Sequence, residues 1–239
     1  NFKVKSHELS DLILNNHISD SIKSEIITSL NKLDVNFVSI RSSAVSEDSS
    51  KTSFAGLHNT YLGINTNSRI FFKYIKKCWA SLFNERALLY RLNKKAPLLE
   101  GMAVIVQEMI PSQFSGITFT THPLNKDILF IEASFGIGNL IVNGEVEPDG
   151  YQIDRKTLKL LDKKIGAKNI SSIFKNGKIK TIKKSKHETN SQLLSFDTVR
   201  EISKTCLDIE KLFRKPQDIE WCIYRDKLWL LQSRAITEV

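Results

Sequence analysis

The stretch 217–234, QDIEWCIYRDKLWLLQSR, constrains the fold more than any other part of the chain. It contains two apolar, aromatic-rich runs on either side of a short charged segment, a pattern that predicts a β-hairpin. If the turn is centred on Asp226, Tyr224 lies opposite Leu228. That choice fixes the partner of every other residue in the hairpin. It also fixes the face on which each side chain lies, because side chains alternate between the two faces of a strand.

One face of the predicted hairpin is polar. In this register Glu220 lies opposite Gln232, and Asp218 lies opposite Arg234. All four side chains project to the same side, since residues two apart share a face. Oxygen ligands beside a fixed cation are suited to a magnesium-bound polyphosphate. The alternative is a structural salt bridge between Asp218 and Arg234, with an incidental glutamate next to it.

The other face of the predicted hairpin is apolar, so we expect it to bury against a helix or a second sheet. A chain of 239 residues can bury a substantial core, as one large domain or as two lobes. The residues on the apolar face are Ile219, Trp221, Ile223, Trp229 and Leu231.

The rest of the pattern predicts an α+β fold with a helical, mixed first part and a strand-rich second part. Pro111 marks the boundary of two lobes, residues 1–110 and 111–239. Apolar residues at helical spacing predict two helices within 6–33, the second capped by Asp20, and further helices at about 68–93 and 196–213. Strands are expected at 37–40, near 58–64, at 102–109, 115–121 and 128–133, and, as shorter candidates, at 151–154, 158–161 and 178–183.

The composition is that of a globular protein. Hydrophobic residues make up 41% of the chain and charged residues 26%, which is ordinary for soluble domains. No apolar run approaches the ~20 residues of a membrane span, and the start does not resemble a signal peptide. The three cysteines are widely spaced, which argues against a disulfide framework or a zinc site. We therefore expect a cytoplasmic protein without a membrane partner.

The net charge of +9 raises the question of nucleic-acid binding. Much of the excess lies in two lysine-rich stretches, 156–168 and 175–186. Neither interleaves aromatic residues in the manner of a base-stacking platform. The favoured interpretation is a solvated surface, and no nucleic-acid partner is expected. A basic background also suits an anionic ligand such as a nucleotide.

The segment 41–60, RSSAVSEDSSKTSFAGLHNT, is a second candidate for chemistry. Arg41 follows a predicted buried strand, and small polar residues come after it. Gly56 would allow the backbone to approach a ligand closely. An arginine at a strand end with free amides beyond it is suited to phosphate oxygens. The alternative is an ordinary surface loop with a structural arginine.

The same segment begins a set of five ordered motifs that resemble the ATP-binding domain of the phosphoenolpyruvate-utilising dikinases. This family includes phosphoenolpyruvate synthase, pyruvate phosphate dikinase, the carbohydrate–water dikinases and rifamycin phosphotransferase. The resemblance covers nearly everything after residue 35 and favours the synthase and rifamycin branch. Its motifs are VSIRSSAVSEDSSKTSFAGLHNTYLGI, CWASLFNERALLYR, VIVQEMIPSQFSGITFTTHP, IEASFGIGNLIVNGEVEPDGYQID and QDIEWCIYRDKLWLLQSRAIT.

The resemblance implies an ATP-grasp-like fold whose two lobes hold the nucleotide. In the first lobe, Arg41 would contact the ATP phosphates. Gly56 and Thr60 lie where the family's loop closes over the phosphate chain. Gln107 matches the strand that borders the adenine, whose edge a backbone amide and carbonyl can read.

In the second lobe, the resemblance implies that Glu220 and Gln232 are magnesium ligands and that Arg234 lies beside the terminal phosphates. These are the residues that the hairpin register places together. Arg41 and Arg234 would be the catalytic residues, because phosphoryl transfer requires mainly positioning and neutralisation of charge. The implied cofactor is Mg²⁺, with ATP as substrate.

The implied reaction passes the β-phosphate of ATP to a histidine on a separate swivelling domain and gives AMP and phosphate. A further acceptor domain would receive the phosphoryl group, with pyruvate, rifamycin or a carbohydrate as the final acceptor. None of the five histidines of this chain lies in the family's Gly-Gly-x-x-Ser-His-like context. The phosphohistidine is therefore expected outside these residues, in the same or a partner chain.

One family feature is missing. A glycine-flanked phosphate-binding lysine precedes the Arg-Ser-Ser motif in the family, and nothing in residues 1–35 matches it. Either the domain begins upstream of Asn1 or the site lacks this lysine. The second case corresponds to a non-catalytic module that senses ATP or AMP. A basic nucleic-acid-binding protein is the remaining hypothesis, and it predicts binding that weakens steeply with salt.

Overall fold

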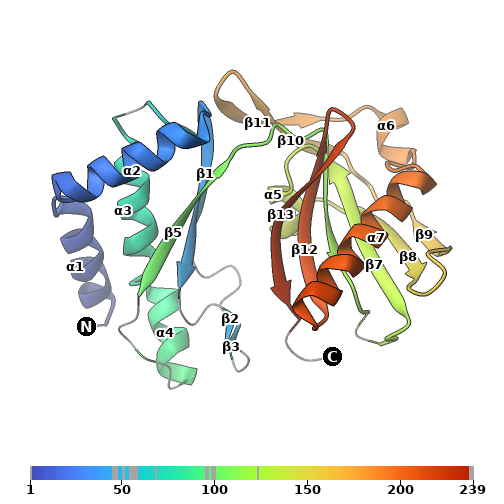
Figure 1. The fold of residues 1–239 in the computed structure, drawn as a ribbon, viewed down its shortest axis with the longest axis horizontal. Coiled ribbons are helices and arrows are strands. Elements are labelled where there is room, and N and C mark those ends of the chain that lie inside the picture. The colour runs from blue at the N-terminus through green and yellow to red at the C-terminus, as the bar shows by residue number, and fades with distance from the viewer. Residues whose placement is uncertain are drawn as a thin grey trace. The chain divides into compact units, whose positions relative to one another are not determined.

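The computed structural model describes residues 2–44, 48–49, 52–53, 59–67, 69–94, 97, 101–122 and 124–236. The chain forms two compact units, Asn1–Met109 and Ile110–Val239 (Figure 1). Each unit combines helices with antiparallel sheet, so the α+β prediction is confirmed. Among the described helices, none is long and apolar enough to cross a lipid bilayer.

The first unit is built on a three-stranded antiparallel sheet in the order β4-β1-β5. Its central strand β1 (Phe37–Ala44) pairs with β4 (Thr60–Asn65) and β5 (Met102–Glu108). A core formed by Val38, Ile40, Ile64, Phe71, Ile75 and Cys78 joins the sheet to α3 (Phe71–Ser81). The other elements are α1 (Phe2–Asn15), α2 (Asp20–Leu33), α4 (Glu85–Lys94) and the short ribbon β2 (Asp48–Ser49) and β3 (Thr52–Ser53).

Two helix predictions for the first unit were wrong in detail. The N-cap of α2 is Ser19, whose Oγ accepts from the Ile22 amide, whereas Asp20 is the first helical residue. The predicted helix 68–93 is two helices, because the chain turns at Leu82. The Leu82 carbonyl, freed by this break, accepts a 2.6 Å hydrogen bond from the guanidinium of the fully buried Arg91.

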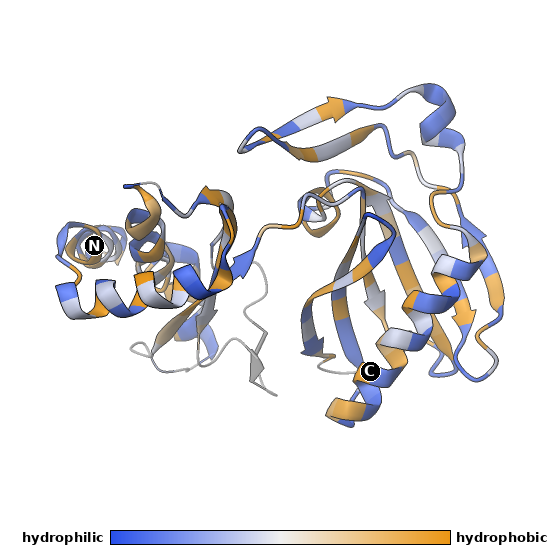
Figure 2. Cartoon of the chain, turned by 45° about the horizontal axis from the view of Figure 1, so that its top comes forward, coloured by the Kyte–Doolittle hydropathy of each residue, from blue (hydrophilic) through white to orange (hydrophobic). Residues whose placement is uncertain are grey.

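The second unit contains a six-stranded antiparallel sheet in the order β13-β12-β6-β7-β8-β9. One face packs against α7 (Phe196–Phe213), which carries both polar and apolar residues (Figure 2) and presents Val199, Ile202 and Cys206 to the core. The predicted bounds of α7 are confirmed. The strands are β6 (Phe114–Phe119), β7 (Ile128–Phe135), β8 (Asp149–Asp154), β9 (Leu160–Lys164), β12 (Gln217–Tyr224) and β13 (Lys227–Ala235).

The opposite face of this sheet is partly covered by α5 (Asn139–Val142) and by the two-stranded ribbon of β10 (Ile170–Lys175) and β11 (Lys178–Lys183). Ile117 of β6 packs there with Ile170 and with the apolar side chains of α5. A short helix, α6 (Lys186–Asn190), follows the ribbon and is closed by a capping box between Ser185 and Glu188. The strand β10 and the helix α6 were not predicted.

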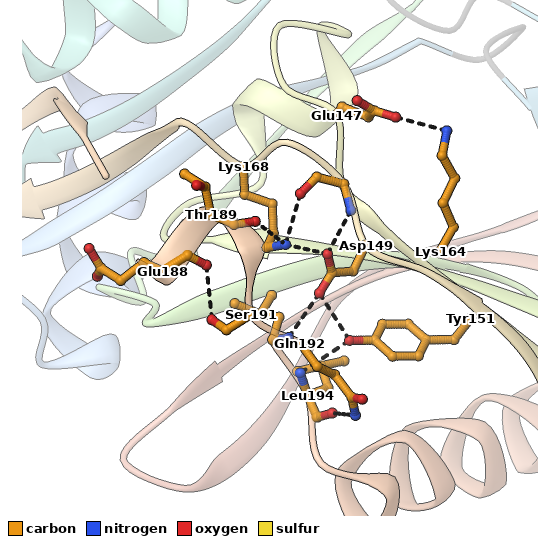
Figure 3. Close-up of polar contacts among 12 residues, drawn as sticks. Glu147, Asp149, Tyr151, Lys164, Lys168, Glu188, Thr189, Ser191, Gln192 and Leu194 are labelled. Carbon is orange, nitrogen blue, oxygen red and sulfur yellow. Dashed lines mark hydrogen bonds and ion pairs between the residues drawn. The ribbon is translucent and has the colours of Figure 1, made fainter. Parts of the chain in front are cut away.

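A buried ion pair between Asp149 and Lys168 holds residues 170–190, the β10–α6 excursion, against the sheet (Figure 3). Lys168 donates to the carboxylate of Asp149 and to the carbonyls of Gly166 and Thr189, at 3.0 and 3.2 Å for the carbonyls. Both ionic side chains have no exposed surface. The second carboxylate oxygen accepts from the Tyr151 hydroxyl at 3.2 Å. The interpretation of 156–168 as solvated surface is therefore wrong for Lys168.

Candidate functional site

The β12–β13 hairpin has the pairing that the sequence predicts for its polar residues. Glu220 pairs with Gln232, and Asp218 pairs with Arg234. The four residues lie on the face of the sheet opposite to the α7 core, since Ile219 between them is fully buried in that core. The sequence-predicted ligands of the second unit are therefore brought together.

The hairpin reaches this register by a different route from the predicted one. Tyr224 pairs with Lys227, not with Leu228, so the turn consists of Arg225 and Asp226 alone. Both turn residues have positive φ, 51° and 57°, as a twist-matched two-residue turn requires. The observed turn is thus one residue shorter than the predicted one. A β-bulge between Glu220 and Trp221, with Leu231 as the extra residue, compensates for this difference and restores the predicted pairing of Glu220 with Gln232.

The bulge also changes one assignment on the apolar face. Ile219 and Trp221 are fully buried in the core, and Leu228 of β13 packs against them. Trp229, predicted to face the core, lies opposite Cys222 and so shares the face of Glu220. The error arose because the prediction placed no bulge in β13, and a shift of one residue moves a side chain to the other face.

Asp218 and Arg234 form the ion pair that the structural alternative required. Arg234 Nη2 lies 3.0 Å from Asp218 Oδ2, and the side chains are only 26% and 20% exposed. Burial raises the pKa of the Asp218 carboxyl, an effect that Arg234 opposes and Glu220 reinforces. The other oxygen, Asp218 Oδ1, is buried without a hydrogen-bond partner in the described part of the chain. The ion pair thus satisfies only one of the two carboxylate oxygens of Asp218.

A further carboxylate lies in the same row of this face. Ile117 of β6 pairs with Glu220 on one side and with Glu132 of β7 on the other. Two strand spacings place the backbones of the two glutamates about 10 Å apart. Burial raises the pKa of the Glu132 carboxyl. Sequence reasoning missed Glu132, because only the pairing of β12, β6 and β7 reveals that it shares a row with Glu220.

The first unit groups its predicted residues on one sheet face. Arg41 pairs with Thr60 on β4, and two residues earlier in β1 Ser39 pairs with Gln107. Arg41, Thr60 and Gln107 therefore share the face turned away from the core residues Val38 and Ile40. The hydroxyl of Ser39 donates to the Gln107 carbonyl at 3.4 Å.

The expected position of Arg41 at the end of a strand was wrong. β1 continues to Ala44, and Arg41 lies within it, flanked by β4 and by β5. The strand extends further because Ser42 and Ser43 also find partners on β5, although they add nothing to the hydrophobic pattern. Gly56, the remaining candidate, lies outside the described residues.

The donor set of the second unit fits a magnesium ion bound together with a polyphosphate. Magnesium prefers oxygen ligands and commonly keeps several waters and phosphate oxygens beside one or two carboxylates. Glu220 and Gln232 supply two facing oxygen ligands, and the unpartnered Asp218 Oδ1 lies one pair away. Within the described residues there is no group of three or more His, Cys, Asp or Glu that could hold a metal ion alone.

The sequence matches the family described as "Pyruvate phosphate dikinase, AMP/ATP-binding domain" over residues 1–239. The chain belongs to this family. The resemblance found in the sequence motifs is therefore confirmed, and the chain corresponds to the AMP/ATP-binding domain of this family.

Curated relatives agree with this assignment. The chain is 36% identical to a probable phosphoenolpyruvate synthase of Methanocaldococcus jannaschii, covering 97% of this chain and 20% of the relative. It is 37% identical to the corresponding protein of Methanothermobacter thermautotrophicus, covering 97% and 35%. It is also 38% identical to the rifampicin phosphotransferase of Bacillus subtilis, covering 83% and 23%. The chain thus spans between a fifth and about a third of the length of these relatives.

Proposed function

We propose that this chain is the ATP-binding part of an enzyme that transfers the β-phosphate of ATP to a histidine on a swivelling domain and releases AMP and phosphate. The observation that carries the proposal is the polar face of the β12–β13 hairpin. There Glu220 faces Gln232, and Arg234 is held by Asp218 one pair away. Membership of an AMP/ATP-binding family supports ATP as the substrate.

In this proposal the polar residues of the hairpin have separate roles in binding the metal and the phosphates. Glu220 and Gln232 hold Mg²⁺, which when bound neutralises phosphate charge. Arg234 is fixed by its 3.0 Å contact with Asp218 and presents its remaining donors to the terminal phosphates. Because Asp218 orients this guanidinium, charge developing on the phosphate oxygens meets a donor that is already in place. These roles require positioning rather than a covalent nucleophile.

The first unit contributes the remaining contacts. Arg41 binds the phosphate chain together with Thr60, which lies directly opposite it, and Gly56 allows the backbone to approach. The strand that contains Gln107 reads the adenine edge through its backbone. In this proposal the two units are the lobes of an ATP-grasp-like fold, divided near residue 110.

The final acceptor defines the class of the whole enzyme. The relatives named as phosphoenolpyruvate synthases and rifampicin phosphotransferases favour pyruvate or a rifamycin. Partners of this domain are then a phosphohistidine domain and an acceptor domain, in the same or another chain. A cytoplasmic location agrees with three cysteines that are all free and buried.

A second candidate is a non-catalytic module that senses ATP or AMP. The two candidates make different predictions about the fate of the β-phosphate.

The decisive experiment follows ATP labelled at the β-phosphorus in the intact protein. Transfer predicts AMP together with an acid-labile, base-stable label on the protein. A sensing module would bind the nucleotide and leave it unchanged, and that result would exclude the transfer reaction.

A further inference from the structure

Four buried side-chain oxygens gather between the polar face of the large sheet and the elements that cover it. None of them has a hydrogen-bond partner within the described residues. Ser115, Ser134 and Ser172 are at most 2% exposed. A buried hydroxyl left without a partner costs roughly 1–3 kcal/mol, so a group of them calls for an occupant. The four atoms are Ser115 Oγ, Ser134 Oγ, Asn139 Oδ1 and Ser172 Oγ.

The backbone brings these residues to one region of the second unit. Ser115 of β6 and Ser134 of β7 are a cross-strand pair on the same face. Beyond Ser134 the chain passes close to Ser172 of β10 and to Ser115 of β6. A Cβ added to Gly136 would lie 2.1 Å from the Ser172 carbonyl oxygen, and one added to Gly138 would lie 3.4 Å from Ser115 Oγ. Asn139 comes next and begins α5.

A carboxylate stands at the edge of this region. Glu132 lies two residues before Ser134 and projects to the same face. It is half-buried, and no hydrogen bond or ion pair with the described residues neutralises it. Ordered water would satisfy the serine hydroxyls, but it would leave this partly buried carboxylate without a counter-ion. A cation would satisfy both the oxygens and the charge.

We propose that Glu132, Ser134, Ser115 and Asn139 bind a monovalent alkali cation, Na⁺ or K⁺. Neutral oxygens that replace a hydration shell, together with a single carboxylate, match the charge of such an ion. Mg²⁺ is a poorer fit, because it dehydrates reluctantly and demands near-ideal octahedral geometry. Ser172 of β10, whose backbone pairs with Gly136, lies beside the loop that leads to Asn139.

The bound cation would tie β6 and β7 to α5. It would therefore act as a structural ion, separate from the Mg²⁺ of the proposed nucleotide site. This inference does not depend on the proposed function, because it concerns stability in the absence of any nucleotide.

The test compares thermal unfolding in KCl, NaCl and N-methyl-D-glucamine chloride at equal ionic strength, without nucleotide or Mg²⁺. An alkali ion at ten times its dissociation constant is expected to raise the melting temperature by about 3–6 °C over the bulky organic cation. The same screening by all three salts removes non-specific charge effects from the comparison.

Two variants assign the effect to the site. Glu132→Gln keeps the size of the side chain and is expected to abolish the difference between the salts. The double variant Ser115→Ala/Ser134→Ala is expected to do the same. Ser203→Ala is the matched control, because Ser203 is equally buried but its hydroxyl donates to the Val199 carbonyl at 2.7 Å. It should lower the melting temperature equally in every salt.

The inference is overturned if the unmodified protein melts at one temperature in all three salts, which would mean that water alone fills the region. It is also overturned if Glu132→Gln, folded as judged by circular dichroism, keeps the full alkali-ion effect.

Discussion

Asp218 shows that the two interpretations of the polar hairpin do not exclude each other. Its Oδ2 pairs with Arg234 at 3.0 Å, as the structural alternative required, while its buried Oδ1 has no partner among the described residues. The ion pair therefore both orients an arginine and leaves an acceptor beside Glu220. Residue identities and their register were enough to predict this grouping, but burial, which raises the pKa of Asp218, appears only in the folded chain.

The raised pKa of Asp218 predicts a pH dependence of stability. The folded state holds this proton more tightly than the unfolded state, whose pKa is near the ordinary 3.8. Protonation thus favours folding, and the contribution is lost as the pH rises from about 4 through the raised pKa. Urea unfolding across this pH range should show a falling component in the unmodified protein that is smaller in Asp218→Asn, where only the part from Glu132, whose pKa is also raised, remains.

Asp208 provides the control for that measurement. A hydrogen bond from Lys211 lowers its pKa, so its contribution has the opposite sign and appears as the pH rises. Asp208→Asn should therefore leave the falling component intact. Equal pH profiles for Asp218→Asn and the unmodified protein would show that Asp218 is not desolvated in the folded state.

At the scale of elements, the sequence predicted long periodic segments well and local breaks poorly. The helix α7 has the predicted bounds, because its apolar residues keep one period over 18 residues. The turn at Arg225–Asp226 and the bulge at Leu231 were missed, and the two errors cancelled at Glu220. The break at Leu82 was also missed. There the free carbonyl of Leu82 accepts a hydrogen bond from Arg91 of the next helix, and no local sequence pattern indicates this contact.

The turn of the hairpin predicts a stabilising substitution. Arg225 and Asp226 both adopt a positive φ, which Asn and Gly tolerate better. The double variant Arg225→Asn/Asp226→Gly should raise the free energy of unfolding by roughly 1 kcal/mol, measured by urea denaturation, because it relieves the left-handed backbone strain of the turn. A loss of stability would mean that these side chains contribute more than their backbone strain costs.

The buried pair of Asp149 and Lys168 predicts a large loss. Lys168→Met leaves the fully buried Asp149 carboxylate without its cation, at a cost of about 3–5 kcal/mol in free energy of unfolding. Lys178→Met, on the exposed strand β11, is the matched control and should change stability by no more than about 0.5 kcal/mol. Similar losses in both variants would contradict the role of the pair in holding the β10–α6 excursion.

At the scale of the whole molecule, family membership was predictable because five motifs follow one another in a fixed order. Elements that have neither a family motif nor a hydrophobic period, such as β10 and α6, could not be predicted from the sequence. They are placed by the Asp149–Lys168 pair and by contacts of Gly136 with Ser172, which no local pattern of the sequence encodes. The same limit applies to Glu132, which joins the polar face only through the order of the strands.

The most direct test of the nucleotide site is calorimetric titration of this chain with ATP, with and without Mg²⁺, after circular dichroism has shown it to be folded. Glu220→Gln is compared with Glu201→Gln, a glutamate on α7 at the other face of the sheet. We expect Mg²⁺ to tighten ATP binding in the unmodified chain and in Glu201→Gln. In Glu220→Gln this gain should fall by about tenfold or more, which corresponds to 1.4 kcal/mol. If folded Glu220→Gln binds Mg-ATP as tightly as the unmodified chain, the polar face of the hairpin is not the metal–phosphate site.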